Sequence, residues 1–270
     1  MSSQGELAIV TGASSGIGAE FARQLVAAGT PVLAVARRGE RLEALAQAAR
    51  AAGHAAIHPL VLDIADREAG TVVRDRARAL GGASWLVNNA GTTRFGRFLD
   101  VDPAALMDLV RLNCESMVGL CAAVVPDLKA RGAGRVINVA SLAAFQPTPF
   151  QTVYGATKAF VLSFSEGLSE ELRGTGVTVT ALCPGPVTTE IFDVGAPGMA
   201  RKPPRHELSP EACVRYALGV ARGGQVVAIP DMMGRITAWS LRLVPRAMVR
   251  RLSARIGLDY VGLKLPPPRP

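Results

Sequence analysis

A tyrosine and a lysine four residues apart form the pair with the clearest chemical potential in this sequence. Tyr154 and Lys158 belong to the segment YGATK. If residues 152–173 form a helix, the two side chains lie on one face of it. An ammonium group beside a phenol favours the phenolate, so it lowers the pKa of the phenol from about 10. Such a phenol can give a proton to a carbonyl oxygen or take one from an alcohol.

The spacing of this pair is short and common. An amphipathic helix with a surface lysine and a half-buried tyrosine would show the same pattern. Other segments, found where strands and helices of the expected fold meet, favour the chemical interpretation.

The first of these segments is a glycine-rich turn near the N-terminus. The apolar run at 7–11 predicts a buried strand, and GASSGIG and then a helical pattern follow it. A lone glycine cluster could be an ordinary loop, but glycines between a strand and a helix suit a dinucleotide pyrophosphate at the helix N-terminus. The expected cofactor contacts in this turn are Gly12, Ser14, Ser15, Gly16, Ile17 and Gly18.

The second expected strand, at 31–36, ends in two arginines and no carboxylate. An acidic residue at this place would bind the adenosine ribose hydroxyls of NAD, whereas guanidinium groups suit the 2′-phosphate of NADP. Arg37 is the stronger candidate. Arg38 could equally be a solvated residue that starts the next helix.

Polar or small residues also follow the third and fourth expected strands. Asp63, after the strand at 56–62, could accept a hydrogen bond from the adenine amino group or cap the following helix. After the strand at 84–88, Asn89, Ala90 and Gly91 would let a flat cofactor lie close, with the asparagines bracing the turn.

Two further polar residues occupy positions that need an explanation. Asn113 falls on the apolar face of the helix expected at 103–131, where a buried amide needs partners. Ser141 ends the strand at 134–140, and ligands bind at the carboxyl ends of strands in open α/β sheets. Residues 190–208, which are rich in glycine, proline and basic residues, predict a loop or lid near the site.

Composition limits the classes of function. With 270 residues, 49% hydrophobic and 19% charged, the chain suits one large or two small α/β domains. The four cysteines lack CxxC spacing and indicate reduced thiols in a cytoplasmic protein, and no signal peptide or spanning run is expected. The three histidines form no metal pattern, so no metal is expected; they are His54, His58 and His206.

The net charge of +8 is concentrated in the tail. Residues 231–270 hold eight Lys or Arg against Asp231 and Asp259, a local charge of +6, which argues against a nucleic-acid-binding core. Two helices are expected at 234–244 and 245–256, with an apolar stripe flanked by arginines. The stripe consists of Leu241, Val244, Met248, Leu252 and Ile256.

Three roles for this stripe compete. The favoured one is that it covers the core or a neighbouring subunit while the arginines face water. The less favoured ones are a peripheral contact with anionic lipid and a mobile flap over the active site.

Strands alternate with helices along the chain, which predicts a parallel sheet covered on both faces. Residues 6–230 also resemble the classical short-chain dehydrogenase/reductase family. The matching segments are TGASSGIG (11–18), Asp63, NNAG (88–91), Asn113, Ser141, YGATK (154–158) and PGPVTT (184–189). The resemblance implies a three-layer, doubly wound Rossmann fold with a seven-stranded parallel sheet over residues 1–230. Residues 231–270 would then be a basic amphipathic extension.

The resemblance also implies a role for each matching residue. Tyr154 would be the acid/base, and Ser141 would hydrogen-bond the substrate oxygen. Lys158 would bind the nicotinamide ribose and lower the pKa of Tyr154, and Asn113 would hold a water that relays protons to Lys158. Further cofactor contacts would come from Ile64, Pro184, Gly185, Val187 and Thr189.

The resemblance implies an NADP(H)-dependent oxidoreductase that forms a homodimer or homotetramer, with Phe145 and Phe150 on the substrate side. Their apolar character suggests an apolar carbonyl compound or secondary alcohol, such as a ketone, an aldehyde, a 3-oxoacyl thioester or a steroid. The alternative from a different class is a dinucleotide-binding regulator or scaffold without turnover. The set Asn113, Ser141, Tyr154 and Lys158 favours the enzyme.

Overall fold

A parallel sheet of seven strands forms the centre of the protein. The computed structural model describes residues 7–195 and 207–261. The spatial order of the strands is β3-β2-β1-β4-β5-β6-β7, and every neighbouring pair is parallel. The strands are β1 (Leu7–Thr11), β2 (Val32–Ala36), β3 (Ile57–Val61), β4 (Ala83–Asn88), β5 (Gly134–Val139), β6 (Val177–Leu182) and β7 (Val227–Ala228). The predicted doubly wound architecture is confirmed.

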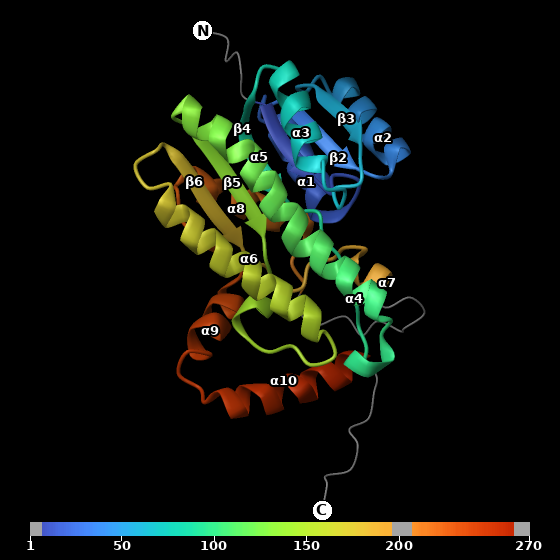
Figure 1. The fold of residues 1–270 in the computed structure, drawn as a ribbon, viewed down its shortest axis with the longest axis vertical. Helices are drawn as coiled ribbons and strands as arrows, with labels where there is room; N and C mark the ends of the chain where they lie inside the picture. Colours follow the sequence, from blue (N-terminus) through green and yellow to red (C-terminus); the bar gives the residue numbers. More distant parts are fainter. Residues whose placement is uncertain (1–6, 196–206, 262–270) are drawn as a thin grey trace, which may run out of the picture.

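Helices cover both faces of this sheet (Figure 1). One face is packed by α1 (Gly16–Ala27), α2 (Gly39–Ala51) and α8 (Pro210–Arg222). The other is packed by α3 (Ala69–Ala79), α5 (Ser116–Arg131) and α6 (Thr152–Glu171). Because both faces are covered, the central strands are short continuous apolar runs, and all five residues of β1 are buried.

The helix before β5 contains a local irregularity. It runs through α4 (Pro103–Val110), a π-helical turn η2 (Arg111–Glu115) and α5. By length and composition this helix of 29 residues could cross a membrane, with an 18-residue window of mean hydropathy 1.4, which the sequence analysis did not anticipate. Its inner face contacts α3 and β4 through buried leucine and valine side chains, as the helix of a sheet-covering layer does.

The shorter elements gather at the end of the sheet toward which the strands run (Figure 1). They are η1 (Phe98–Asp100), η3 (Leu142–Phe145), α7 (Ile191–Gly195), α9 (Met232–Ser240) and α10 (Arg246–Val261). In this part of the fold, segments distant in sequence meet, and this is also where ligands of open α/β sheets bind.

The apolar stripe of the tail, favoured to cover the core or a neighbouring subunit, does not face the core; its burial by a neighbouring subunit stays a prediction. Met248, Leu252 and Ile256 are exposed, so this apolar stripe does not cover the core of its own chain. The buried side of α10 carries Val249, Ser253 and Leu258 instead. Small residues on this side allow a close approach: a Cβ on the neighbouring Gly257 would lie 2.8 Å from the main-chain oxygen of Pro149.

Candidate active site

The glycine-rich turn between β1 and α1 leaves no room for side chains at two of its glycines. Gly12 has φ +65°, and a Cβ there would lie 2.8 Å from Nδ2 of Asn89. A Cβ on Gly18 would overlap the main-chain oxygen of Gly12 and the same amide nitrogen. The turn is therefore packed tightly against itself and against Asn89, forming a compact cradle that only glycine permits at these positions. Such a tight glycine turn is the kind that lies against a dinucleotide.

The N-terminus of α1 is available to an anion. The N-cap residue, Ser15, makes no side-chain cap with the helix, and its hydroxyl oxygen instead accepts a hydrogen bond from Arg38 at 2.7 Å. The first turn of α1 carries no acidic residue. The first N–H groups of a helix have no intrahelical partner, so they can bind phosphate oxygens.

The two arginines after β2 occupy different environments. Arg38 donates to the hydroxyl of Ser14 at 3.1 Å and pairs with Glu190 at 3.0 Å, in addition to its bond with Ser15. Arg37 is largely exposed and approaches Asp63 at 3.4 Å. Arg38, which we expected to be the weaker candidate, is therefore the arginine tied to the glycine turn.

Asp63 and its neighbour are held by local contacts. One oxygen of Asp63 accepts the N–H of Ala65 at 3.0 Å within the turn after β3. The next helix, α3, begins at Ala69 with Glu68 as its N-cap residue, so the expectation that Asp63 caps this helix is wrong. The side chain of Ile64 is buried in the core between the sheet and α3, so only its backbone can face a cofactor. Contact of Asp63 with adenine stays a prediction.

A threonine that the sequence analysis missed organises the turn after β4. The Thr11 hydroxyl oxygen accepts the N–H groups of Asn89 at 3.1 Å and Ala90 at 3.0 Å. The side-chain amide of Asn89 donates in return to the main-chain oxygen of Thr11 at 2.9 Å. Asn88 points the other way, into the core, where it donates to Asn138 at 2.8 Å. Only Asn89 therefore braces the cofactor side.

The segment after β6 lies against the glycine turn. A Cβ on Gly16 would be 3.0 Å from the methyl group of Thr189. The main-chain oxygen of Pro184 accepts the N–H of Leu142 at 2.9 Å, which fixes this segment beside η3. Val187 is buried against α1 and α8, so its side chain faces the core. Residues 184–189 thus lie between the glycine turn and η3.

Three of the predicted catalytic side chains come together beside the end of β5. The Ser141 hydroxyl accepts the N–H of Ala143 at 3.1 Å and lies near enough to the Tyr154 phenol to lower its pKa. Lys158 donates to the main-chain oxygen of Val139 at 2.7 Å, with its nitrogen 5.7 Å from the centroid of the Tyr154 ring. A proton donor, a second hydroxyl and a buried cation therefore lie in one place.

The direction of the Tyr154 pKa shift differs from the sequence-based prediction. Burial raises the pKa of the Tyr154 phenol, and the nearby Ser141 hydroxyl offsets this only in part. Burial also lowers the pKa of Lys158 to about 8. Both groups lose hydration, which outweighs the attraction between a cation and a phenolate. The phenol is therefore protonated at neutral pH and suited to donate its proton.

The fourth predicted catalytic residue, Asn113, lies in the π-helical turn, and its amide connects two segments of the site. Its Nδ2 donates to the main-chain oxygen of Thr92 and to the hydroxyl of Thr157, both at 3.0 Å. Thr157 in turn donates to the main-chain oxygen of Tyr154 at 2.7 Å. Asn113 therefore anchors the helix that carries the catalytic pair, and its proposed water relay stays a prediction.

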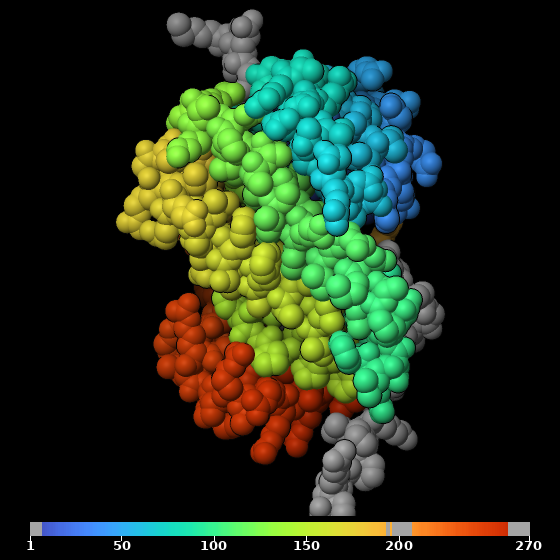
Figure 2. All heavy atoms as spheres, viewed as in Figure 1, coloured from blue at the N-terminus to red at the C-terminus, as the bar shows by residue number. Residues whose placement is uncertain are grey.

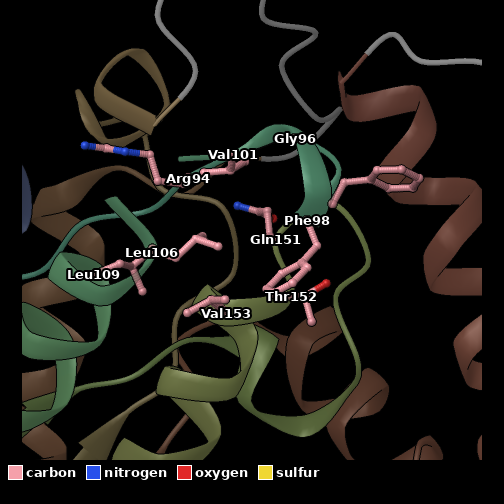
Figure 3. Close-up of a pocket in the computed structure, with 10 residues that line it drawn as sticks. Arg94, Gly96, Phe98, Val101, Leu106, Leu109, Gln151, Thr152 and Val153 are labelled. Atoms are coloured by element: carbon pink, nitrogen blue, oxygen red, sulfur yellow. The ribbon is translucent and has the colours of Figure 1, made fainter. Parts of the chain in front are cut away.

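The two phenylalanines expected on the substrate side line other cavities. Phe145 borders a cavity of about 380 Å³ between the start of α6 and Arg246 of α10. Phe150 borders a pocket of about 10 Å³, together with Phe98 and Leu106 (Figure 3). Neither cavity is lined by Ser141 or Tyr154, so contact of these rings with a substrate stays a prediction.

Comparison with known proteins identifies the class. The family model described as short chain dehydrogenase matches residues 6–197. The chain belongs to this family of oxidoreductases, as the sheet topology and the grouping of Ser141, Tyr154 and Lys158 already indicated.

Three similar proteins show the range of the family. A short chain dehydrogenase from Pseudocercospora fijiensis is 40% identical over 198 residues, which cover 72% of this chain and 62% of that relative. A short-chain dehydrogenase from Sphingobium yanoikuyae, solved with NADPH, has 30% identity and a TM-score of 0.78, covering 98% of each chain. The bulky-bulky ketone specific alcohol dehydrogenase from Comamonas testosteroni has 28% identity and a TM-score of 0.75, covering 99% of this chain and 98% of that one.

Proposed function

We propose that this protein is an NADP-dependent oxidoreductase that transfers a hydride between the nicotinamide and an apolar carbonyl compound or secondary alcohol. The observation that carries the proposal is the grouping of Ser141, Tyr154 and Lys158 at the end of β5. The glycine cradle of α1 borders the same end of the sheet. A nicotinamide dinucleotide would be held by this cradle, by the turn at Asn89 and by residues 184–189.

The proposed reaction assigns one task to each side chain. When bound, the reduced nicotinamide supplies the hydride that the carbonyl carbon accepts. The Ser141 hydroxyl donates a hydrogen bond to the substrate oxygen, where negative charge develops. Tyr154 transfers its phenolic proton to that oxygen, giving the alcohol. Lys158 stabilises the phenolate that remains, and in the oxidative direction Tyr154 takes the proton back.

The preference for NADP rests on the arginines after β2. Arg38 is fixed beside Ser14 and Ser15, next to the turn that would hold the pyrophosphate, and Arg37 lies near Asp63. No carboxylate takes the place where NAD would need an acceptor for its ribose hydroxyls. The complex of the Sphingobium relative with NADPH supports this assignment.

The apolar substrate is supported by the surroundings of the site. Prolines and phenylalanines dominate residues 145–150, between Ser141 and Tyr154. The Comamonas relative is described as specific for bulky-bulky ketones, which is consistent with a large apolar carbonyl compound here. We therefore expect ketones with two large substituents, steroid-like ketones among them, to be better substrates than small polar aldehydes.

The alternative is a dinucleotide-binding regulator without turnover. A test that separates the two is the oxidation of NADPH by the purified protein with a panel of steroid-like ketones, aryl ketones, aldehydes and 3-oxoacyl thioesters. The enzyme consumes NADPH with at least one member of the panel. Tight binding of NADPH with no turnover of any carbonyl compound, and no reduction of NADP by the matching alcohols, would instead support the regulator.

We also propose a cytoplasmic homo-oligomer, a dimer or a tetramer. Three of the four cysteines are buried and all four are free, which suits a reducing compartment. Sedimentation analysis of the purified protein determines the oligomeric state, and fractionation of the native cells determines the compartment.

A further inference from the structure

The two tail helices expose an unusual concentration of large apolar side chains. Nine of the seventeen large hydrophobic residues that are exposed in the described part of the chain lie between positions 232 and 256. We call this set the C-terminal apolar face; its members are Met232, Met233, Ile236, Trp239, Leu243, Val244, Met248, Leu252 and Ile256. Figure 2 shows that the tail segment forms a lobe at one end of the molecule. Exposed apolar side chains gathered on one pair of helices in this way indicate an interaction surface.

The charges between Asp231, the N-cap residue of α9, and Asp259, near the end of α10, are all positive. Between positions 232 and 258 the chain has six arginines and no aspartate or glutamate. All six arginines are exposed, and within the described residues none of them forms an ion pair. They are Arg235, Arg242, Arg246, Arg250, Arg251 and Arg255. On the helical wheel of α10, Arg251 and Arg255 lie directly beside Met248 and Leu252.

We propose that α9 and α10 form a docking surface for an anionic lipid bilayer. Apolar side chains bordered by arginines, with a tryptophan among them, match the interface between acyl chains and anionic headgroups. A second copy of this chain is a poorer match. A two-fold contact through the C-terminal apolar face would place arginines of one protomer against those of the other, with no carboxylate between positions 232 and 258 to neutralise them.

The C-terminal apolar face lies at the same end of the molecule as the candidate active site. The tail helices lie at the end of the sheet toward which the strands run, where Ser141 and Tyr154 also lie (Figure 1). A docked protein would therefore hold its active-site end near the bilayer, from which an apolar carbonyl compound could be drawn. This consequence rests on the proposed function, whereas lipid binding itself needs no cofactor and no turnover.

Co-sedimentation with vesicles tests the docking of the full chain. One set of vesicles is phosphatidylcholine alone, and the other contains roughly one third phosphatidylserine. We expect sedimentation with the anionic set at low salt, weaker binding at high salt and little binding to the neutral set. Absence of binding to anionic vesicles at low salt would overturn the proposal, as would salt-independent binding to both sets. Self-association through this face without lipid binding would assign the face to a second copy.

Paired variants separate the apolar and the charged contributions. The double variant Arg251→Gln/Arg255→Gln should bind anionic vesicles roughly thirtyfold more weakly, because each arginine contributes about 1 kcal/mol to the binding free energy. The double variant Met248→Ser/Leu252→Ser should lose the vesicle binding that remains at high salt, because that binding depends on the apolar side chains. The matched controls are Val72→Ser on α3 and Arg50→Gln on α2, which are exposed away from the tail and should bind as the wild type does. Equal losses in the controls would contradict the assignment.

Tryptophan fluorescence reports the contact independently. The chain has two tryptophans, Trp85 with 4% and Trp239 with 65% of its surface exposed. Docking should shift the emission to shorter wavelength as the indole of Trp239 leaves water. In Trp239→Phe the shift should vanish while sedimentation persists. A shift that remains in this variant would mean that Trp239 does not enter the lipid.

Discussion

The ammonium nitrogen of Lys158 lies 2.7 Å from the main-chain oxygen of Val139. This hydrogen bond joins the second turn of α6 to the last residue of β5. It holds the Lys158 ammonium near the ring of Tyr154. A buried ammonium needs such partners, because it has lost the hydration that an exposed lysine keeps. Ser141 and Tyr154 lie between Val139 and Lys158 in sequence, so the same two elements determine their positions.

The first prediction concerns the cost of burying Lys158. The pKa of its ammonium is lowered by burial from its ordinary value of 10.5 to about 8, so the unfolded chain holds an extra proton between these pH values. The stability of the wild type therefore gains on the order of 3 kcal/mol relative to Lys158→Met as the pH rises through this window. Denaturant unfolding of both proteins between pH 7 and 10.5 measures the difference. A difference in unfolding free energy that does not change with pH would contradict the burial of a charged lysine.

The second prediction concerns the pH dependence of alcohol oxidation. Oxidation needs the phenolate of Tyr154, and burial raises the pKa of this phenol above its ordinary value of 10.0. The oxidative kcat/KM should therefore keep rising with pH, without a plateau near neutrality. The measurement is a pH profile with NADP and a secondary alcohol that the panel identifies. A plateau that begins near pH 7 would show that the pKa of the Tyr154 phenol lies far below 10.0, which contradicts a pKa raised by burial.

The third prediction concerns Ser141. Replacing it with alanine removes a hydrogen bond to the substrate oxygen and should slow the chemical step by about 10²–10³-fold. The same change removes the bond to the N–H of Ala143, which should cost about 1 kcal/mol of stability. Single-turnover kinetics measures the first effect and thermal unfolding the second. If the chemical step keeps its rate, Ser141 has only the structural role.

The fourth prediction concerns the choice of cofactor. NADPH should bind more tightly than NADH, and Arg37→Ala or Arg38→Ala should each weaken NADPH by roughly tenfold to a hundredfold with little effect on NADH. Arg41→Ala is the matched control, because Arg41 shares Glu190 with Arg38 but makes no hydrogen bond to the glycine turn within the described residues. Equal dissociation constants of NADPH and NADH for the wild type would refute the role of both arginines.

Local patterns predicted most of the fold and of the candidate site. A strand, a glycine turn and a helix are adjacent in sequence, so Gly12 and Gly18 could be assigned to the cradle without knowledge of distant contacts. Tyr154 and Lys158 share one helix, so their spacing is enough to place them on the same face. The seven strands and their doubly wound arrangement followed from the resemblance to a known family, because strand alternation alone predicts only a parallel sheet covered on both faces.

Contacts between distant segments could not be predicted in this way. The bond from Lys158 uses a backbone oxygen of β5, and backbone groups leave no trace in side-chain patterns. Thr11 is one more buried strand residue by its pattern, although it holds the turn after β4. The orientation of α10 depended on small residues, such as Gly257, that fit against Pro149. The raised pKa of Tyr154 required knowledge of burial, which spacing does not supply.

The direct test of the proposed function is the replacement of Tyr154 with phenylalanine. This change removes the proton that the reaction needs and keeps the ring, so the fold and the affinity for NADPH should persist. Single-turnover reduction of a substrate from the carbonyl panel, with NADPH prebound, should fall by at least about 10²-fold, in line with loss of a general acid. A correctly folded Tyr154→Phe protein that binds NADPH and reduces the carbonyl at the wild-type rate would contradict the account.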